Sequence, residues 1–380
     1  MKKVLKLLCL ALCVVLALGC FSGCGKEKAY VIGFSGPLSG DASVYGDAVK
    51  NSAQMAIDEI NEAGGLNGVK FKLEAIDDKN DTSNIQTNFA TLMDKGMQVS
   101  LGTVTTKPGL AFSEASKDEV FFITPSASGD DIPKYDNGFQ MCFADSNQGI
   151  AAADYVNKTD YKEIGVFYKS DDPYSDGIYK KFKENLDSSI KVVETAFTDA
   201  TSTDFSTQIN KLKNCKFIFM PIYYTPASVF MQQATNKVAK DTVYYGCDGF
   251  DGIESAEGFD INAIPQEVTM LSHFNSKATD GAAADFIKKY TEKYGKETLN
   301  QFGASAYDCV YAIFNAMKKA VDEGTEIPVN ISAKELLAIL QKQFTGDFKY
   351  SGNTGTDITW EDSGYVSKSA VQYVIKEASK

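Results

Sequence analysis

The sequence predicts an α/β protein with two doubly wound lobes. From Lys28 onward, short apolar runs alternate with helical patterns, which is typical of βαβ units in a parallel sheet. The alternation forms two successive series of about 115 residues each, the size of a domain. The length of 380 residues agrees with this, since domains average roughly 150 residues. Apolar residues make up 44% of the chain, enough for a sizeable core in each lobe.

The first series predicts strands separated by helices. Apolar residues between 49 and 60 recur at helical spacing, and Gly64 and Gly65 end that helix. Asp81 is expected to cap the next helix, which runs to about Lys95, and a third helix precedes the last strand. The expected strands are, in order, residues 30–34, 69–76, 99–101 and 120–123.

The second series repeats the alternation. Its helices are expected at about 175–186, near 204–214 and up to 238. Its strands are expected at 163–168, 192–196, 217–220 and 242–245. No flexible linker separates the two series, so we expect a hinge made by the chain passing between the lobes, with the functional site in the cleft.

The chain begins with the pattern of a bacterial lipoprotein signal. Three lysines lie within the first six residues, and residues 7–18 are uninterrupted apolar. That run fits a signal peptide and is too short to span a bilayer. Small residues then lead to Cys20 and again to Cys24, so either one resembles the lipidated cysteine of a lipobox. We expect residues 1–23 to form the signal and lipobox, with cleavage before 20 or 24, and residues 24–28 to form a tether. The alternative is an ordinary secretory signal in which the cysteines have no role.

The composition disfavours several classes of function. The chain has 50 acidic and 38 basic residues, a net charge of −12, and every basic residue is lysine. An acidic chain without arginine is a poor candidate for nucleic-acid binding, because bidentate contacts to guanine and phosphate need guanidinium groups. The single histidine, His273, excludes a multi-histidine metal site and disfavours a histidine-based catalytic triad. The glycine-rich loop at 35–40 lacks both the GxGxxG and the P-loop pattern, so no nucleotide or other cofactor is expected.

Four cysteines lie beyond the amino-terminal segment and lack any CxxC spacing. This disfavours a zinc or redox motif, and four cysteines in so long a chain do not indicate a disulfide framework. We expect unpaired, packed thiols, since free cysteine is among the most buried residue types. These residues are Cys142, Cys215, Cys247 and Cys309.

Two hydroxyl-rich loops follow predicted strands of the first series, at residues 102–106 and 124–128. Ligands of open α/β sheets bind at the carboxyl ends of the strands. Hydroxyl groups together with the backbone N–H groups of helix N-termini suit a carboxylate. A catalytic serine is disfavoured, because the chain has no GxSxG elbow.

Asp248 ends a strand of the second series, in the run Gly-Cys-Asp-Gly. Other paired acidic residues of the chain are interpreted as solvated loop or capping carboxylates, and capping is also the alternative for Asp248. A carboxylate at a strand end can instead face a ligand cation. Hydroxyl loops on one wall of the cleft and Asp248 on the other would together hold a zwitterion.

Several motifs, taken in order, carry a family resemblance. They are YVIGFSGPLSGDASVYGDAVKNSAQMAIDEIN from residue 30, then FFITPSAS, VFYKSDDPYSDG, DFSTQINKLK and YYGCDG. In this order they resemble the branched-chain amino-acid binding protein family of ABC importers, over residues 28–374. The resemblance implies two Rossmann-like lobes of the periplasmic-binding-protein-like I type, joined by three crossovers and closing over a small ligand. We place the crossovers near 142–145, near 271–274 and around 348–359.

The resemblance also implies roles for individual residues. The ligand carboxylate would bind the hydroxyls of Thr106 and Ser128 and backbone groups of Val104 and Ser126. The ligand ammonium would pair with Asp248, where relatives have glutamate. Closure of the cleft and the side-chain pocket would involve Tyr45, Tyr174, Tyr223 and Phe302.

The implied protein is a solute-binding lipoprotein and not an enzyme. It would capture a small amino acid, branched-chain or similar, and deliver it to the permease and ATPase subunits of an importer while anchored as a monomer to the outer face of the cell membrane. The alternative is a ligand sensor, or a binder of an amide such as urea, with the same fold. The first lobe would comprise residues 29–142 and 275–347, and the second lobe residues 143–274 and 348–380.

Overall fold

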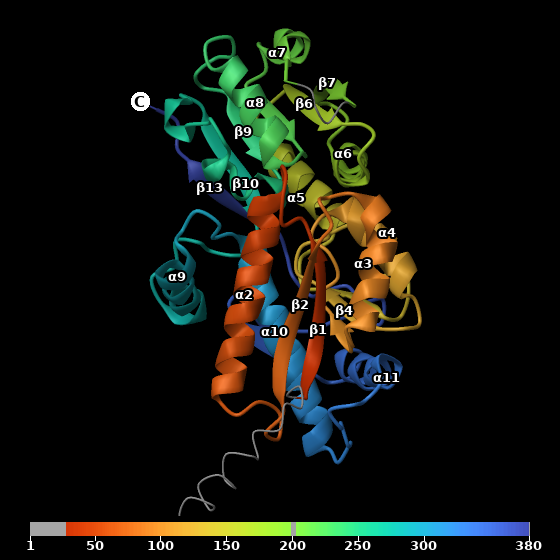
Figure 1. Ribbon diagram of the computed structural model, residues 1–380. Helices are drawn as coiled ribbons and strands as arrows, with labels where there is room; N and C mark the ends of the chain where they lie inside the picture. The colour runs from red at the N-terminus through yellow and green to blue at the C-terminus, as the bar shows by residue number, and fades with distance from the viewer. Residues whose placement is uncertain (1–27, 199–202, 380) are drawn as a thin grey trace, which may run out of the picture.

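The computed structural model describes residues 28–198 and 203–379 as two α/β lobes, one above the other in Figure 1. The expected signal, the lipobox cysteines Cys20 and Cys24 and most of the tether lie outside the described residues. Within the described part of the chain, no helix combines the length and the apolar character needed to cross a membrane.

The first lobe is built on a parallel sheet with the strand order β2-β1-β3-β4-β5. In Figure 1, helices α2 and α10 run side by side on one face, and α3 and α4 lie on the other. The strands are β1 (Ala29–Gly36), β2 (Lys70–Asp77), β3 (Val99–Ser100), β4 (Phe121–Thr124) and β5 (Gly138–Gln140). The helices are α2 (Ser43–Glu62), α3 (Thr82–Asp94), α4 (Thr106–Ser116), α9 (Gly281–Tyr294), α10 (Gln301–Asp322) and α11 (Ala333–Phe344).

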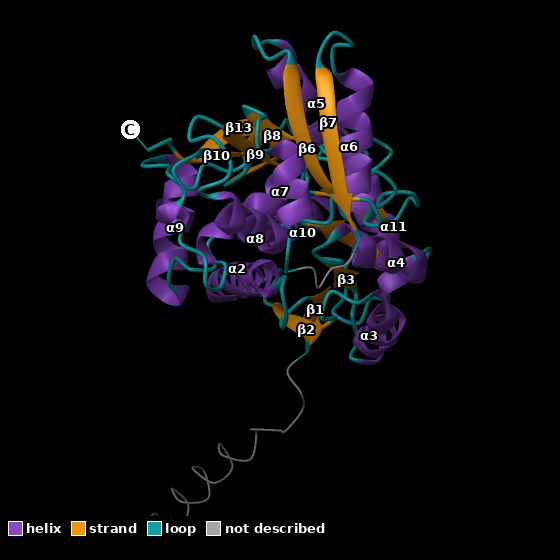
Figure 2. Ribbon diagram, turned by 90° about the horizontal axis from the view of Figure 1, so that it is seen from above, coloured by secondary structure: helices purple, strands orange, loops and turns teal. Residues whose placement is uncertain are grey.

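The second lobe is built on a sheet with the order β13-β10-β9-β8-β6-β7, in which β13 alone of the described strands runs antiparallel to its neighbour. Figure 2 shows α5 and α6 on one side of β6 and β7, with α7 and α8 on the other. The strands are β6 (Glu163–Lys169), β7 (Lys191–Phe197), β8 (Phe217–Met220), β9 (Val243–Gly246), β10 (Glu267–Ser272) and β13 (Val371–Lys376). The helices are α5 (Asp145–Asn157), α6 (Pro173–Asn185), α7 (Ser206–Leu212) and α8 (Tyr224–Ala234), with 3₁₀ turns at Asp248–Phe250, Ile253–Ser255 and Ile261–Ala263.

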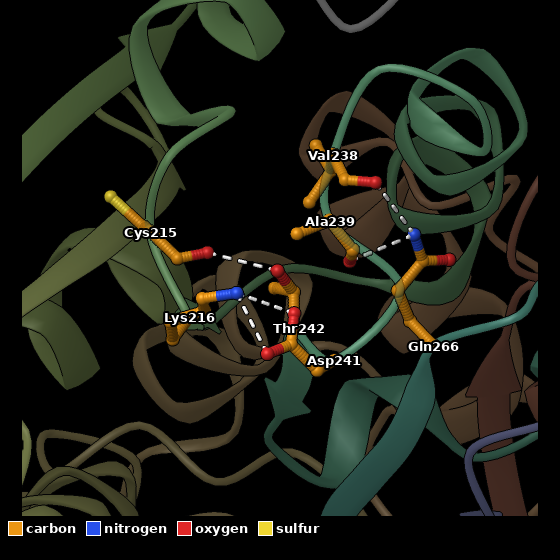
Figure 3. Close-up of polar contacts among 7 residues, drawn as sticks. All are labelled: Cys215, Lys216, Val238, Ala239, Asp241, Thr242 and Gln266. Atoms are coloured by element: carbon orange, nitrogen blue, oxygen red, sulfur yellow. Dashed lines mark hydrogen bonds and ion pairs between the residues drawn. The ribbon is translucent and has the colours of Figure 1, made fainter.

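Polar contacts fasten the amino-terminal ends of the second sheet's central strands (Figure 3). The Thr242 hydroxyl donates to the Cys215 carbonyl at 3.0 Å, and the Lys216 ammonium lies 2.5 Å from a carboxylate oxygen of Asp241. The Gln266 amide donates to two carbonyls of the turn before β9. These contacts set the register of β8, β9 and β10, whose opposite ends face the first lobe.

The predicted elements up to residue 246 are confirmed, with shifts of a few residues at their ends. Asp81 caps α3 as expected, since its carboxylate accepts the Ser83 N–H at 2.9 Å. The helix expected to reach 238 ends at Ala234, and turns continue from there. The four cysteines beyond the amino-terminal segment are unpaired and buried, as the sequence predicted.

The chain passes between the two sheets three times. The first passage follows β5 and the second follows β10, near the expected positions. The third was placed wrongly at 348–359. That stretch holds the hairpin of β11 (Tyr350–Gly352) and β12 (Gly355–Ile358), and the chain stays on the first lobe beyond it. The Gly364 carbonyl accepts the Gln140 N–H at 3.0 Å, and the Lys368 ammonium still donates to the Thr354 hydroxyl. The indole of Trp360 explains this: it packs at a tilt against Phe344 of α11, with ring centroids 4.5 Å apart, and donates to the Gln140 carbonyl at 2.7 Å.

A buried polar cluster holds this hairpin to α10. The Asp308 carboxylate accepts hydrogen bonds from the Tyr350 hydroxyl at 2.9 Å and from the backbone N–H groups of Asn353 and Thr354. The Thr354 hydroxyl donates to Asp308 and accepts from the Lys368 ammonium, each at 2.5 Å. Burial lowers the pKa of Lys368 to about 8, while the negative charge of Asp308 opposes that shift.

Candidate ligand-binding site

A small cavity of about 10 Å³, the room that one water needs, lies between the lobes. It is bounded by loops that follow the carboxyl ends of strands in both sheets, the place where open α/β sheets bind ligands. The structure brings all nine predicted binding residues to its wall and adds Thr105. The lining residues are Tyr45, Val104, Thr105, Thr106, Ser126, Ser128, Tyr174, Tyr223, Asp248 and Phe302.

The wall from the first lobe offers hydroxyls and a helix N-terminus. Thr106 is the first residue of α4, so its N–H is one of the four that a helix cannot bond internally. The side chains of Thr106 and Ser128 are both 2% exposed. The Ser126 N–H, expected to be available to a ligand, instead donates to the Thr124 hydroxyl at 3.3 Å within its own loop. An anion at this wall would therefore rely on the two hydroxyls and the start of α4.

The wall from the second lobe carries a buried carboxylate. Asp248 is 1% exposed, its Oδ1 accepts the Tyr174 hydroxyl at 2.7 Å, and its own N–H donates to Gln148 at 2.9 Å. Its Oδ2 has no hydrogen-bond partner among the described residues. Burial raises the pKa of Asp248 to about 6. The hydrogen bond from Tyr174 stabilises the charged carboxylate and so opposes this rise. Such a carboxylate is costly without a donor, so Oδ2 is a suitable acceptor for a ligand cation.

A second buried carboxylate, Asp145, lies beside this site and was missed by the sequence analysis. It begins α5 directly after the first passage and is 3% exposed. Its Oδ2 lies 3.4 Å from the Thr106 hydroxyl, and its Oδ1 lies 3.4 Å from the Gln148 amide. Burial, and next the negative charge of Asp248, raise the pKa of Asp145 well above its usual range. In the sequence, an aspartate at the start of a helix is interpreted as a helix cap. No local pattern therefore indicated that Asp145 belongs to the site.

Aromatic rings fill the space between the two walls. Tyr174 and Tyr223 stack with ring centroids 4.5 Å apart and planes 10° apart. Tyr45 packs edge-on against Phe302 at 4.9 Å. The Tyr45 hydroxyl crosses the cleft from α2 and donates to the Gly249 carbonyl at 2.5 Å. The rings supply apolar surface, and the Tyr45 hydroxyl links the two lobes.

Asp248 does not act as the cap that was its alternative interpretation. It belongs to a three-residue 3₁₀ turn, and its carboxylate bonds to a tyrosine of α6. The cavity thus combines a wall of hydroxyls at a helix N-terminus, an opposite wall with a buried carboxylate, and an aromatic lining.

Comparison with known proteins agrees with this geometry. The model of a family described as periplasmic binding protein matches residues 29–356. The chain is 29% identical to the Leu/Ile/Val-binding protein BraC3 of Rhizobium johnstonii, over 79% of this chain and 85% of that protein. It is 27% identical to the leucine-, isoleucine-, valine-, threonine- and alanine-binding protein of Pseudomonas aeruginosa, over 78% of this chain and 79% of that one.

Solved structures show the same architecture. The branched-chain amino acid transporter substrate-binding protein LivJ of Streptococcus pneumoniae, in complex with isoleucine, has a TM-score of 0.75 and 27% identity, and the match covers 91% of this chain and 100% of that one. A solute-binding protein of an ABC transporter from R. palustris, in complex with benzoate, has a TM-score of 0.77 at 18% identity, covering 92% and 94%. The second likeness shows the fold alone. With its two-lobed fold and a family match spanning most of its length, the chain belongs to the periplasmic binding protein family.

Proposed function

We propose that the protein captures a small aliphatic amino acid outside the cytoplasm and delivers it to the permease of an ABC importer. The observation that carries this proposal is the unpartnered oxygen of Asp248, buried in the cavity across from the start of α4. A buried acceptor facing an anion-binding wall suits a ligand with both an ammonium and a carboxylate group.

In this proposal the ligand carboxylate binds the hydroxyls of Thr106 and Ser128 and the N-terminus of α4. The ammonium binds Asp248 and is also attracted by Asp145. Two buried carboxylates repel each other, and one ammonium placed near both relieves that repulsion. The rings of Tyr45 and Phe302 contact the ligand side chain.

A ligand of the benzoate type is the competing candidate, because a structural neighbour binds benzoate. Benzoate has a carboxylate but no ammonium, so it would leave both buried acidic groups without a cation. A neutral amide such as urea would leave the anion-binding wall without its charge. Each alternative satisfies only one wall, which favours an amino acid.

The test has two steps. Mass spectrometry identifies the small molecule that co-purifies with the protein, and calorimetric titration then compares L-leucine, L-isoleucine, L-valine and L-alanine with benzoate and urea. We expect an aliphatic amino acid to bind with a micromolar or lower Kd, as four or five charged hydrogen bonds permit after ordering costs. Binding of benzoate or urea in preference to every amino acid would overturn the proposal.

The proposal includes anchoring by lipid at Cys20 or Cys24. It is supported by the short apolar run and the small residues that precede each cysteine. The native protein should be found in the membrane fraction, with a mass that shows cleavage before residue 20 or 24 plus a diacylglyceryl group. Substituting each cysteine by serine in turn identifies the lipidated one, and an unlipidated native protein would contradict the anchoring.

A further inference from the structure

The first turn of α10 is capped from both lobes. A helix leaves the N–H groups of its first turn without an internal acceptor. The Asn300 side chain, in the same lobe, accepts the N–H groups of Phe302 and Gly303, each at 3.0 Å. The Gln301 N–H instead donates at 2.8 Å to the carboxylate of Asp251, which belongs to the second lobe. One N–H group of this helix is thus satisfied from across the cleft.

Asp251 lies beside the ligand cavity without lining it. It ends the 3₁₀ turn that begins at Asp248, and its own N–H donates to the Asp248 carbonyl at 2.9 Å. On the first lobe, Phe302 directly follows Gln301 and lines the cavity. The contact between Asp251 and Gln301 therefore joins the two walls of the site next to the ligand and not through it.

This contact can exist only while the lobes are together. In an opened protein the carboxylate and the N–H would each return to water. In the closed arrangement they form a charge-assisted hydrogen bond, and the carboxylate lies at the positive end of the α10 dipole. Two neutral hydrogen bonds flank it across the same interface. They run from the Tyr45 hydroxyl to the Gly249 carbonyl at 2.5 Å and from the Ser255 hydroxyl to the Glu297 carbonyl at 2.6 Å.

We propose that Asp251 sets the affinity of the site by holding the lobes closed, without contacting the ligand. This inference rests on the proposed amino-acid ligand and on closure of the lobes around it. A bond that forms only in the closed arrangement slows the release of the ligand and leaves its first encounter with the open protein unchanged. Asp251 is in this sense a positioning residue, which acts on the ligand through Gln301 and the start of α10.

The test compares Asp251→Ala with Asp260→Ala in calorimetric titrations with L-leucine and L-valine. Asp260 is the matched control, because its carboxylate also accepts a backbone N–H, that of Asn262 at 2.9 Å, but within the second lobe. Asp251→Asn is the conservative variant, since its side-chain oxygen can still accept the Gln301 N–H.

Removing a carboxylate that caps a helix should weaken binding by Asp251→Ala about 2- to 30-fold. The factor should be the same for both amino acids, because the lost bond does not involve the ligand side chain. Stopped-flow measurements should show the loss in the dissociation rate, with an unchanged association rate. Asp251→Asn should recover part of the loss, and Asp260→Ala should bind as the wild type does.

Three results of the titrations would overturn the inference. Unchanged affinity in Asp251→Ala would mean that the bond does not stabilise closure. An equal loss in Asp251→Ala and Asp260→Ala would mean that the loop after β9 has merely loosened. A loss that differs between L-leucine and L-valine would mean that Asp251 contacts the ligand itself.

Hydrogen exchange without added amino acid provides a measurement that does not depend on the ligand. The Gln301 amide should exchange faster in Asp251→Ala than in the wild type or Asp260→Ala, and unchanged exchange would rule out the contact across the cleft. If the wild type binds no amino acid, the proposed ligand is wrong, and the exchange of the Gln301 amide then decides by itself whether Asp251 joins the lobes.

Discussion

Asp248→Asn removes the charge proposed to face the ligand ammonium and keeps the shape of the side chain. The tyrosine bond to Oδ1 can persist, because the asparagine oxygen also accepts the Tyr174 hydroxyl. Losing one charge-assisted hydrogen bond costs about 1.5–3 kcal/mol, or roughly 10- to 150-fold in affinity. We therefore expect Kd for the co-purified amino acid to rise by that factor.

Stability should move in the opposite direction. The pKa of Asp248 is raised from 3.8 to about 6 by burial, which corresponds to a cost of about 3 kcal/mol for the ionised carboxylate in the folded protein at neutral pH. Asparagine removes that cost, so the variant without ligand should melt at the same temperature as the wild type or higher. A capping carboxylate would give the reverse pattern, with lower stability and unchanged affinity.

Asp78→Asn is the matched control. Asp78 is fully buried in the first lobe, and burial likewise raises its pKa to about 6, but it does not line the cavity. Its substitution should affect melting and leave Kd unchanged. Calorimetric titration and thermal unfolding of the three proteins separate the effects. Equal dissociation constants for wild type and Asp248→Asn would refute the ammonium assignment.

Four further outcomes are expected. Asp145→Asn should weaken amino-acid binding less than Asp248→Asn does, because the Asp145 carboxylate is already in contact with Thr106 and Gln148. A larger loss of affinity in Asp145→Asn, measured by calorimetric titration, would contradict this. Affinity should be constant above pH 7 and fall by up to tenfold per pH unit below about 6, since Asp248 must lose its proton to bind an ammonium; titrations at pH 5 and 8 check this, and Asp248→Asn should lack the trend. Asp308→Ala should lower the free energy of unfolding by about 3 kcal/mol or more, measured by denaturant titration, because four donors, three of them buried, lose their acceptor. Small-angle scattering should give a smaller radius of gyration with the bound amino acid than without it, as the lobes close about the three passages; identical profiles at saturation would contradict hinge closure.

The sequence by itself determined the architecture of each lobe and most of the cavity wall. Short apolar runs that alternate with helical patterns locate the parallel strands and their helices. This works because the buried residues of a helix or strand recur at the period of that element. The rule that ligands bind at the carboxyl ends of strands then pointed to the loops at 102–106 and 124–128 and to Asp248 without knowledge of how the strands pair. The choice of Thr106 and Ser128 within those loops, the tyrosines and Phe302 came from the family resemblance, and the cavity wall contains them all.

Only the tertiary structure decided which side chains meet across the lobes. Asp145 and Asp248 are a hundred residues apart, and their proximity depends on where the first passage delivers α5. The hydrogen bond from the Tyr45 hydroxyl to the Gly249 carbonyl likewise joins the two lobes. The third passage was misplaced because the packing of Trp360 on the first lobe, and not a local turn signal, sets where the chain leaves it. A buried aspartate and a solvated one have the same letter in a sequence, and burial is a property of the surrounding elements that the order of residues along the chain does not display.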